Sequence, residues 1–285
     1  MHEQRVGIIG GDKRQTYMAN LLAAKGYIVS TYKVNEEGLT ERCHRMKTLE
    51  ELLACSRIIL GPVPFTRGEG VIPASGEGIS IEEFLKLVGE GTFLYAGCLT
   101  ELIIRQCEGR GVRCYDYMKN ERVAIYNSIA TAEGTILEML ANHPANIHGS
   151  HCLVTGYGRC ARTLADKLQG LRAQVTVCAR SERDREDART HGYRAIPFIR
   201  LGDGIGEYEY IINTVPSLVM PKDVMARVSC DSLVIDIASV PGGVDFQAAK
   251  KAGIPVIHAL GLPGKYAPKS SACLLVDIFL SIQSN

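Results

Sequence analysis

Residues 151–161 read HCLVTGYGRCA, and this stretch decides the fold class. The apolar run before Gly156 has the composition of a buried strand, and the residues after Gly158 have the spacing of a helix. Gly156, Gly158 and Ala161 match the pattern G-x-G-x-x-(G/A) that joins such a strand to such a helix. Gly156 allows a tight turn, Gly158 lets the backbone approach a pyrophosphate, and Ala161 allows close helix packing. The stretch therefore predicts a nucleotide-binding β-α-β unit.

The same arrangement occurs once more, near the start of the chain. VGIIGG at 6–11 precedes a helical segment, Gly26 and a second apolar run, as residues 151–158 precede a helical segment, Gly170 and AQVTVCAR. Two such openings predict two doubly wound, Rossmann-like α/β domains in tandem. Gly10-Gly11-Asp12 lacks the spaced second glycine and places a carboxylate where a phosphate would lie. We therefore assign the first copy to substrate binding or to the fold alone.

Further short, β-rich runs follow each copy. Glycine-rich or helical segments separate them, and this rhythm predicts a parallel sheet in each half. The runs span 58–60, 92–97, 112–117, 210–216, 232–239 and 254–260.

Two helices are expected to connect the halves. Residues 121–142 have apolar side chains at helical spacing and end before His143-Pro144, so we expect one long helix joining the domains. Residues 271–282 predict a last helix that crosses back to the first domain.

The composition is that of a folded globular protein. The 285 residues correspond to about two domains of roughly 150 residues. We place an N-terminal domain at residues 1–144 plus 270–285 and a nucleotide-binding domain at residues 145–269, facing each other across a cleft. Lys and Arg number 32 and Asp and Glu number 31, for a net charge of +1. No global field therefore favours nucleic acid or an anionic membrane as partner.

The ten cysteines include no C-x-x-C pair. Zinc and cluster sites usually need ligands a few residues apart, so we predict no metal site. Cys152 and Cys178, among others, lie in apolar runs where a thiol packs as a small hydrophobic group. The N-terminus lacks the basic and apolar regions of a signal peptide, and no apolar stretch reaches about 18 residues. We expect reduced cysteines in a cytoplasmic protein.

The residues after Ala179 bear on the choice of cofactor. Arg180 and Ser181 can hold a 2′-phosphate by charge-assisted hydrogen bonds, with Arg183 close by, which favours NADP. The alternative is a solvated Arg180 with the adjacent Glu182 reaching a ribose, which would suit NAD.

Polar and turn residues end the later strands, at the edge where α/β sheets bind ligands. Asn213 to Pro216 are expected to meet the ribose or carboxamide of the cofactor, and Asp236 and Ser239 end the next strand. The loop at 260–270 is either a connector or part of the substrate site. The cofactor candidates are Gly156, Tyr157, Gly158, Arg159, Cys160, Arg180, Ser181, Arg183, Asn213, Thr214, Val215, Pro216, Asp236 and Ser239.

Six motifs are distributed over nearly the whole chain. They are GGDKRQ at 10–15, TAEGT at 131–135, GYGRCA at 156–161, NTVPS at 213–217, DIASVPGGVDF at 236–246 and GLPGKYAPKSSA at 261–272. Together they resemble the A subunit of bacterial dipicolinate synthase, and the last two are the most specific. One departure is Ala130, which stands where that family usually has proline before TAEG.

The resemblance implies an NAD(P)-dependent enzyme that makes pyridine-2,6-dicarboxylate during sporulation, in the cytoplasm of the mother cell. Its precursor would be of the dihydrodipicolinate type, and its partner a flavoprotein-like B subunit. The implied reaction is an oxidative aromatisation, in which a ring hydride goes to nicotinamide C4 and a ring proton is lost. Such an enzyme must orient the ring and hold two carboxylates.

Cations and hydrogen-bonding side chains near the expected cleft are the substrate candidates. They are Arg14, Thr66, Arg67, Asn127, Thr131 and Ser270. The catalytic candidates are Lys269, Glu133 and His258, and the general base stays open between Glu133 and His258. We also expect a homo-oligomer. Two other interpretations remain: a different hydroxy-acid or amino-acid dehydrogenase, and a nucleotide-binding subunit that is inactive without its partner.

Overall fold

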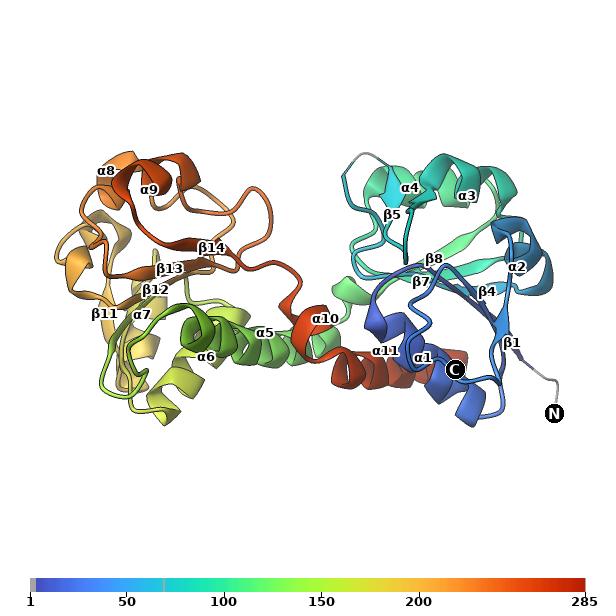
Figure 1. Cartoon of the computed structure of the whole chain (residues 1–285), viewed down its shortest axis with the longest axis horizontal. Helices are drawn as coiled ribbons and strands as arrows, with labels where there is room; N and C mark the ends of the chain where they lie inside the picture. The colour runs from blue at the N-terminus through green and yellow to red at the C-terminus, as the bar shows by residue number, and fades with distance from the viewer. Residues whose placement is uncertain (1–3, 69, 285) are drawn as a thin grey trace. The chain divides into compact units, whose positions relative to one another are not determined.

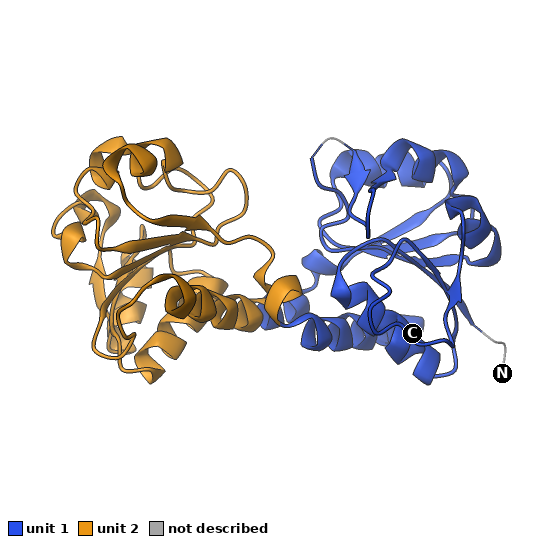
Figure 2. Cartoon of the chain, in the orientation of Figure 1, with its two compact units in different colours: residues 1–126, 267–285 blue, residues 127–266 orange. Residues whose placement is uncertain are grey.

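The computed structural model describes residues 4–68 and 70–284. The chain divides into two compact units, one of residues 1–126 with 267–285 and one of residues 127–266 (Figure 2). Each unit has its own parallel sheet with helices on both faces, which confirms the two doubly wound domains predicted from the glycine turns.

The first unit contains a six-stranded parallel sheet in the order β3-β2-β1-β4-β7-β8 (Figure 1). Its strands are β1 (Arg5–Ile9), β2 (Ile28–Tyr32), β3 (His44–Arg45), β4 (Ile58–Leu60), β7 (Phe93–Ala96) and β8 (Arg113–Asp116), and a small antiparallel pair is formed by β5 (Val71–Ile72) and β6 (Ile79–Ser80). Its helices are α1 (Lys13–Ala24), α2 (Leu49–Cys55), α3 (Ile81–Leu87), α4 (Glu101–Glu108), the 3₁₀ turn η1 (Tyr117–Lys119) and α11 (Pro268–Gln283).

The second unit repeats this order in a sheet β11-β10-β9-β12-β13-β14. Its strands are β9 (His151–Thr155), β10 (Gln174–Cys178), β11 (Arg194–Ile196), β12 (Tyr210–Asn213), β13 (Leu233–Asp236) and β14 (Val256–His258). Its helices are α6 (Arg159–Gly170), α7 (Glu182–Thr190), η2 (Phe198–Arg200), η3 (Ile205–Glu207), α8 (Lys222–Met225), α9 (Phe246–Ala252) and α10 (Leu262–Tyr266). In both sheets the strand order reverses beside the first strand of the repeat, which is where such sheets bind ligands.

The last helix returns to the first unit, as expected. Leu275 and Phe279 of α11 are buried in one core cluster with Met18 and Leu22 of α1. Helices α2, α3 and α4 supply the core on the other face of the same sheet. Both faces are therefore covered, as the apolar strands of an all-parallel sheet require.

The long helix α5 (Glu121–Asn142) has the bounds predicted from its periodicity. Val123 belongs to the core of the first unit, whereas Ala132 and Met139 belong to the core of the second. For this reason the units divide between residues 126 and 127, within the helix, and not at residue 144 where the sequence placed the boundary. The second boundary likewise falls before α11, at 266 and 267, and not at 269.

Helices α1 and α6 end in different ways. Gly26 follows α1 with φ +88°, the left-handed conformation typical of a helix end. Gly170 is the last residue of α6, and the left-handed residue after this helix is Arg172 with φ +67°. The second copy thus places a side chain where the first has glycine.

Candidate functional site

A pocket of about 640 Å³ lies at the carboxyl ends of β9, β10 and β12. The strand order reverses between β9 and β12, so this is the place where a doubly wound sheet binds a nucleotide. The lining residues are Gly156, Tyr157, Gly158, Ala179, Arg180, Ser181, Asp184, Phe198, Thr214, Val215, Pro216, Ser217 and Val219. The remaining cofactor candidates do not line it: these are Arg159, Cys160, Arg183, Asn213, Asp236 and Ser239.

The glycine turn after β9 has the geometry that its sequence predicts. Gly156 has φ +88°, and a Cβ on it would lie 2.5 Å from Oγ1 of Thr214. Gly158 is the N-cap of α6, no side chain caps this helix, and a Cβ on Gly158 would meet no atom within 4 Å. The N-cap of α6 thus supplies no side-chain acceptor, and the space beside it is open. A helix N-terminus in this state suits a phosphate.

Arg180 and Ser181 lie at the rim of this pocket, after β10. Arg180 is exposed, and Ser181 caps α7 by accepting a hydrogen bond from the N–H of Asp184 at 3.0 Å. Glu182, the residue considered as a ribose ligand, is not part of the lining, whereas Asp184 is. The sequence pattern missed Asp184 because it stands one turn beyond the position where such a carboxylate is expected.

Asn213 and Asp236 are completely buried and bond to each other, with 2.8 Å between Asn213 Nδ2 and Asp236 Oδ1. Asn213 Oδ1 also accepts from the hydroxyl of Thr155 at 2.6 Å and from the N–H of Val215 at 3.1 Å. Asp236 Oδ2 accepts from the N–H of Gly243 at 2.7 Å. These side chains join the ends of β9, β12 and β13 and fix the loops around the pocket. Neither side chain lines the pocket, although the sequence suggested both as cofactor contacts.

The candidates on α5 face helix α6. Glu133 pairs with Lys167 at 3.0 Å, and Thr131 hydrogen-bonds the thiol of Cys160. Burial raises the pKa of Cys160, which outweighs the influence of Arg159 and Thr131. Asn127 begins the second unit. None of these residues lines the pocket above the glycine turn.

His258 ends β14 and is exposed. Its Nε2 lies 3.4 Å from the carbonyl oxygen of Ala238, and its ring centre lies 5.2 Å from that of Phe246. His258 stands two strands away from β12, so the structure does not bring it to the lining of the pocket.

In the first unit, Arg14 is the best-defined candidate. It is 5% exposed, its Nε donates to Asp12 Oδ1 at 2.9 Å, and its Nη2 donates to Asp12 Oδ2 at 2.8 Å and to the carbonyl of Val63. Burial raises the pKa of Asp12, but the hydrogen bonds and charge of Arg14, with the charge of Arg67, hold it below its usual range. Arg14 and Arg67 therefore gather around Asp12 where the strand order reverses, and the half-buried Thr66 precedes Arg67.

The opening of α11 and the turn before it have different surroundings. Lys269 and Ser270 are exposed in the first turn of α11. Lys265, in α10, donates to Glu138 at 2.7 Å, and Tyr266 donates to the same oxygen at 2.6 Å. These bonds lower the pKa of Glu138 more than burial raises it. Helix α10 is thereby fixed to α5, within the second unit.

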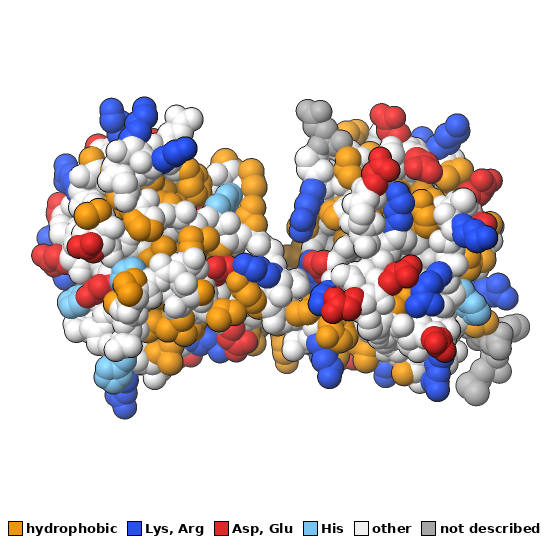
Figure 3. Space-filling view, in the orientation of Figure 1, with side chains coloured by type: hydrophobic (Ala, Val, Ile, Leu, Met, Phe, Trp, Pro, Cys, Tyr) orange, Lys and Arg blue, Asp and Glu red, His pale blue; other side chains and the backbone are white. Residues whose placement is uncertain are grey.

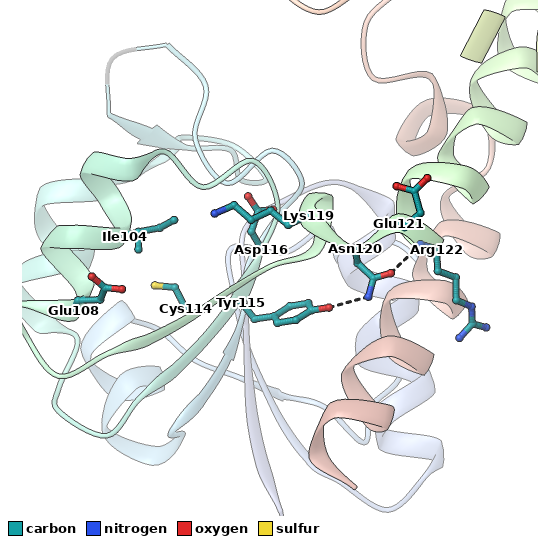
Figure 4. Close-up of a pocket in the computed structure, with 9 residues that line it drawn as sticks. All are labelled: Ile104, Glu108, Cys114, Tyr115, Asp116, Lys119, Asn120, Glu121 and Arg122. Carbon is teal, nitrogen blue, oxygen red and sulfur yellow. Dashed lines mark hydrogen bonds between the residues drawn. The ribbon is translucent and has the colours of Figure 1, made fainter. Parts of the chain in front are cut away.

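The first unit has a further pocket of about 590 Å³ at its edge strand β8 (Figure 4). Figure 4 shows that its side chains come from α4, β8, the η1 turn with Asn120 after it, and the start of α5. Asn120 donates to the hydroxyl of Tyr115 at 2.9 Å, and Asp116 accepts N–H bonds from Cys98, Leu99 and Met118. Carboxylates and cations line it together, and it contains none of the predicted site residues.

The described residues show no candidate metal site, no disulfide and no helix that could span a membrane. Among them, no three His, Cys, Asp or Glu side chains come together in a way that could hold a metal ion. The ten cysteines are all free thiols. No helix in the described ranges has the length and apolar character to cross a membrane. Acidic and basic side chains are interspersed over the visible face of the first unit (Figure 3).

Comparison with known proteins places these features in a family. The family described as the N-terminal domain of the dipicolinate synthase A subunit matches residues 5–118. The A subunit of dipicolinate synthase from Bacillus subtilis (strain 168) is 32% identical over 289 aligned residues, covering 96% of this chain and 94% of the relative. The crystal structure of the A subunit of dipicolinate synthase from Bacillus halodurans superposes with a TM-score of 0.89 at 29% identity, covering 99% of this chain and 98% of that one.

A more distant relative matches a smaller part of the chain. Shikimate dehydrogenase (NADP(+)) of Acidiphilium cryptum (strain JF-5) is 33% identical over 141 residues, which cover 47% of this chain and 51% of the relative. Two doubly wound units, one with an uncapped glycine turn above a pocket, define a protein with the fold of the dehydrogenase-type oxidoreductases. Within that class, the chain belongs to the family of the dipicolinate synthase A subunit.

Proposed function

We propose that the second unit binds NADP, with NAD as the alternative, and that the chain oxidises a dihydrodipicolinate-type precursor to dipicolinate. The observation that carries the proposal is the uncapped N-terminus of α6 above a pocket whose rim holds Arg180 and Ser181. Backbone N–H groups would face the pyrophosphate, and Arg180 with Ser181 would face a 2′-phosphate. The name of the shikimate dehydrogenase relative specifies NADP(+), which agrees with this choice.

In the proposed reaction the precursor loses a hydride and a proton. When bound, the nicotinamide accepts the hydride at C4, giving the aromatic ring, the reduced cofactor and a free proton. Because aromatisation supplies driving force, the task of the protein is to orient the ring and hold its two carboxylates. Arg14 is buried and fixed by Asp12, so its guanidinium is preorganised for this task. Arg67, Thr66, Ser270 and Lys269 are the accompanying candidates, together with Asn127 and Thr131.

The proton would be accepted by Glu133 or His258. Glu133 already pairs with Lys167 at 3.0 Å, so its carboxylate is engaged with α6. Histidine is the residue type best suited to accept a proton near neutral pH, and His258 is exposed with no ion pair among the described residues. We therefore favour His258 over Glu133 as the general base. A loss of activity in His258→Gln that clearly exceeds the loss in Glu133→Gln would support this order, and the reverse would contradict it.

The family also suggests a setting for the reaction. We propose that the chain works with a flavoprotein-like B subunit, as a homo-oligomer, in the cytoplasm of the mother cell of a sporulating bacterium. The word subunit in the names of the relatives supports a partner.

Purified chain should be mixed with a dihydrodipicolinate-generating system and NADP or NAD, with and without the B subunit. Formation of dipicolinate together with reduced cofactor is expected. Product in neither mixture would reject the proposal, and product only with the B subunit would favour a chain that is inactive alone. Arg14→Ala should weaken substrate use and spare nucleotide binding. An equal loss of both would contradict the division of roles between the two units.

A further inference from the structure

Arg162, in the first turn of α6, ties the glycine turn to the next helix. Its Nε donates to the carbonyl of Tyr157 at 3.0 Å, and its guanidinium carbon lies 4.2 Å from the centre of the Tyr157 ring. Tyr157 is the middle residue of the turn and lines the pocket. Arg162 is therefore held against the nucleotide site without lining it.

The other end of the same guanidinium contacts two carboxylates on α7. Nη1 pairs with Asp187, and Nη2 lies 3.5 Å from Oδ1 of Asp184. Of these two acids, Asp184 lines the pocket and Asp187 does not. One cation thus reaches from the glycine turn to the carboxylate at the rim of the pocket.

Asp184 is the lining carboxylate closest in sequence to the proposed 2′-phosphate residues. Its backbone N–H donates to the hydroxyl of Ser181 at 3.0 Å, and Arg180 and Ser181 line the same pocket. A carboxylate with no partner at this place would repel a 2′-phosphate and could accept a bond from a 2′-hydroxyl. A carboxylate held by Arg162 has its charge compensated and its orientation fixed.

We propose that Arg162 is a specificity-determining residue, which keeps the site selective for the 2′-phosphorylated nucleotide by holding Asp184. The inference rests on the proposed nucleotide site and adds to it a reason for the preference. Arg162 acts through Asp184 and Tyr157, so it is a positioning residue.

The test is a double-mutant cycle on the full-length chain. Dissociation constants for NADP and NAD are measured by calorimetry for wild type, Arg162→Met, Asp184→Asn and the double variant. Methionine keeps the apolar stem of arginine, and thermal unfolding verifies that each variant folds. Arg162→Met should weaken NADP about tenfold and change NAD less than about twofold, because it releases a negative charge near the phosphate.

The double variant should recover NADP affinity to within about twofold of Asp184→Asn, because the released charge is then absent. Asp187→Asn is the matched control, since it removes a carboxylate from Arg162 outside the pocket and should leave the NADP to NAD ratio unchanged. An equal loss of both nucleotides in Arg162→Met, or no recovery in the double variant, would overturn the inference while the nucleotide site stands. If Arg162→Met does not fold, a lower NADP to NAD affinity ratio in Arg162→Lys than in wild type supports the inference, and an unchanged ratio overturns it. Wild type that binds neither nucleotide would overturn the proposed function itself.

Discussion

The two glycine turns occupy the same place in two sheets of the same strand order, yet they differ at the N-cap of the helix that follows. Asp12 caps α1 with its own carboxylate and holds Arg14, whereas Gly158 leaves α6 without a side-chain cap. The first helix therefore has an internal anion, and the second has room for an external one. The difference teaches that one of two similar turns fills the space before its helix with a side chain, whereas the other leaves that space open, as a bound anion would require.

Moving the cap from the first turn to the second should have the largest effect. Gly158 has φ −79° and open space around its absent side chain, so Gly158→Asp should fold. Its carboxylate would accept the helix N–H groups and repel the pyrophosphate, and nucleotide affinity should fall more than about 100-fold, or about 2.7 kcal/mol. Calorimetry with NADP measures this. Gly158→Asn, which is similar in size and uncharged, should bind better than Gly158→Asp, and affinity equal to wild type in Gly158→Asp would refute the comparison.

Removing the charge from the first turn should cost stability. In Asp12→Asn, the buried guanidinium of Arg14 loses its charged partner, and we expect the free energy of unfolding to drop by about 2 kcal/mol near neutral pH. Because the pKa of Asp12 is below its unfolded value, its stabilisation is present above about pH 4 and is lost as pH falls through the lowered folded pKa.

Urea unfolding of wild type and Asp12→Asn at several pH values checks this prediction. The difference between the two proteins should be full at neutral pH and should shrink below about pH 4. A constant difference would show that the carboxylate charge is irrelevant. NADP affinity at neutral pH should be the same in both, since Asp12 lies in the other unit.

The sequence was enough to predict the sheets and the long helix because these depend on local periodicity. The helix at 121–142 and the last helix were predicted from apolar spacing, and the turn at Gly156 was predicted from its glycine pattern. The domain boundary could not be predicted in this way. Val123 and Met139 are both apolar residues of one helix, and the sequence does not show that they enter different cores.

The pocket was predicted in part, for a similar reason. Gly156, Gly158 and Thr214 line it because backbone geometry at strand ends is fixed by the motif. Asn213 and Asp236 were expected to face the cofactor, yet their side chains bond to each other in the interior. Side-chain direction at a strand end depends on partners distant in sequence, which no local pattern reveals.

The third prediction concerns the charge of Arg180 at the rim of the pocket in the second unit. In Arg180→Ala, affinity for NADP should fall about tenfold, or about 1.4 kcal/mol, and affinity for NAD should stay unchanged, because only the 2′-phosphate needs the cation. Arg194→Ala removes an equal charge from β11 outside the pocket and is the control. An unchanged ratio of the two affinities in Arg180→Ala would argue for NAD.

The smallest effect concerns the far ends of the paired helices, where the two copies differ by a side chain. Arg172 follows α6 with φ +67°, a conformation that Gly26 adopts after α1 without a Cβ. Arg172→Gly should therefore raise the free energy of unfolding by about 0.5–1 kcal/mol. Gly26→Ala should lower it by a similar amount, since a Cβ there meets no atom within 4 Å and only the backbone conformation opposes it. Urea denaturation measures both, and destabilisation by Arg172→Gly would show that the arginine side chain, and not its backbone, decides how α6 ends.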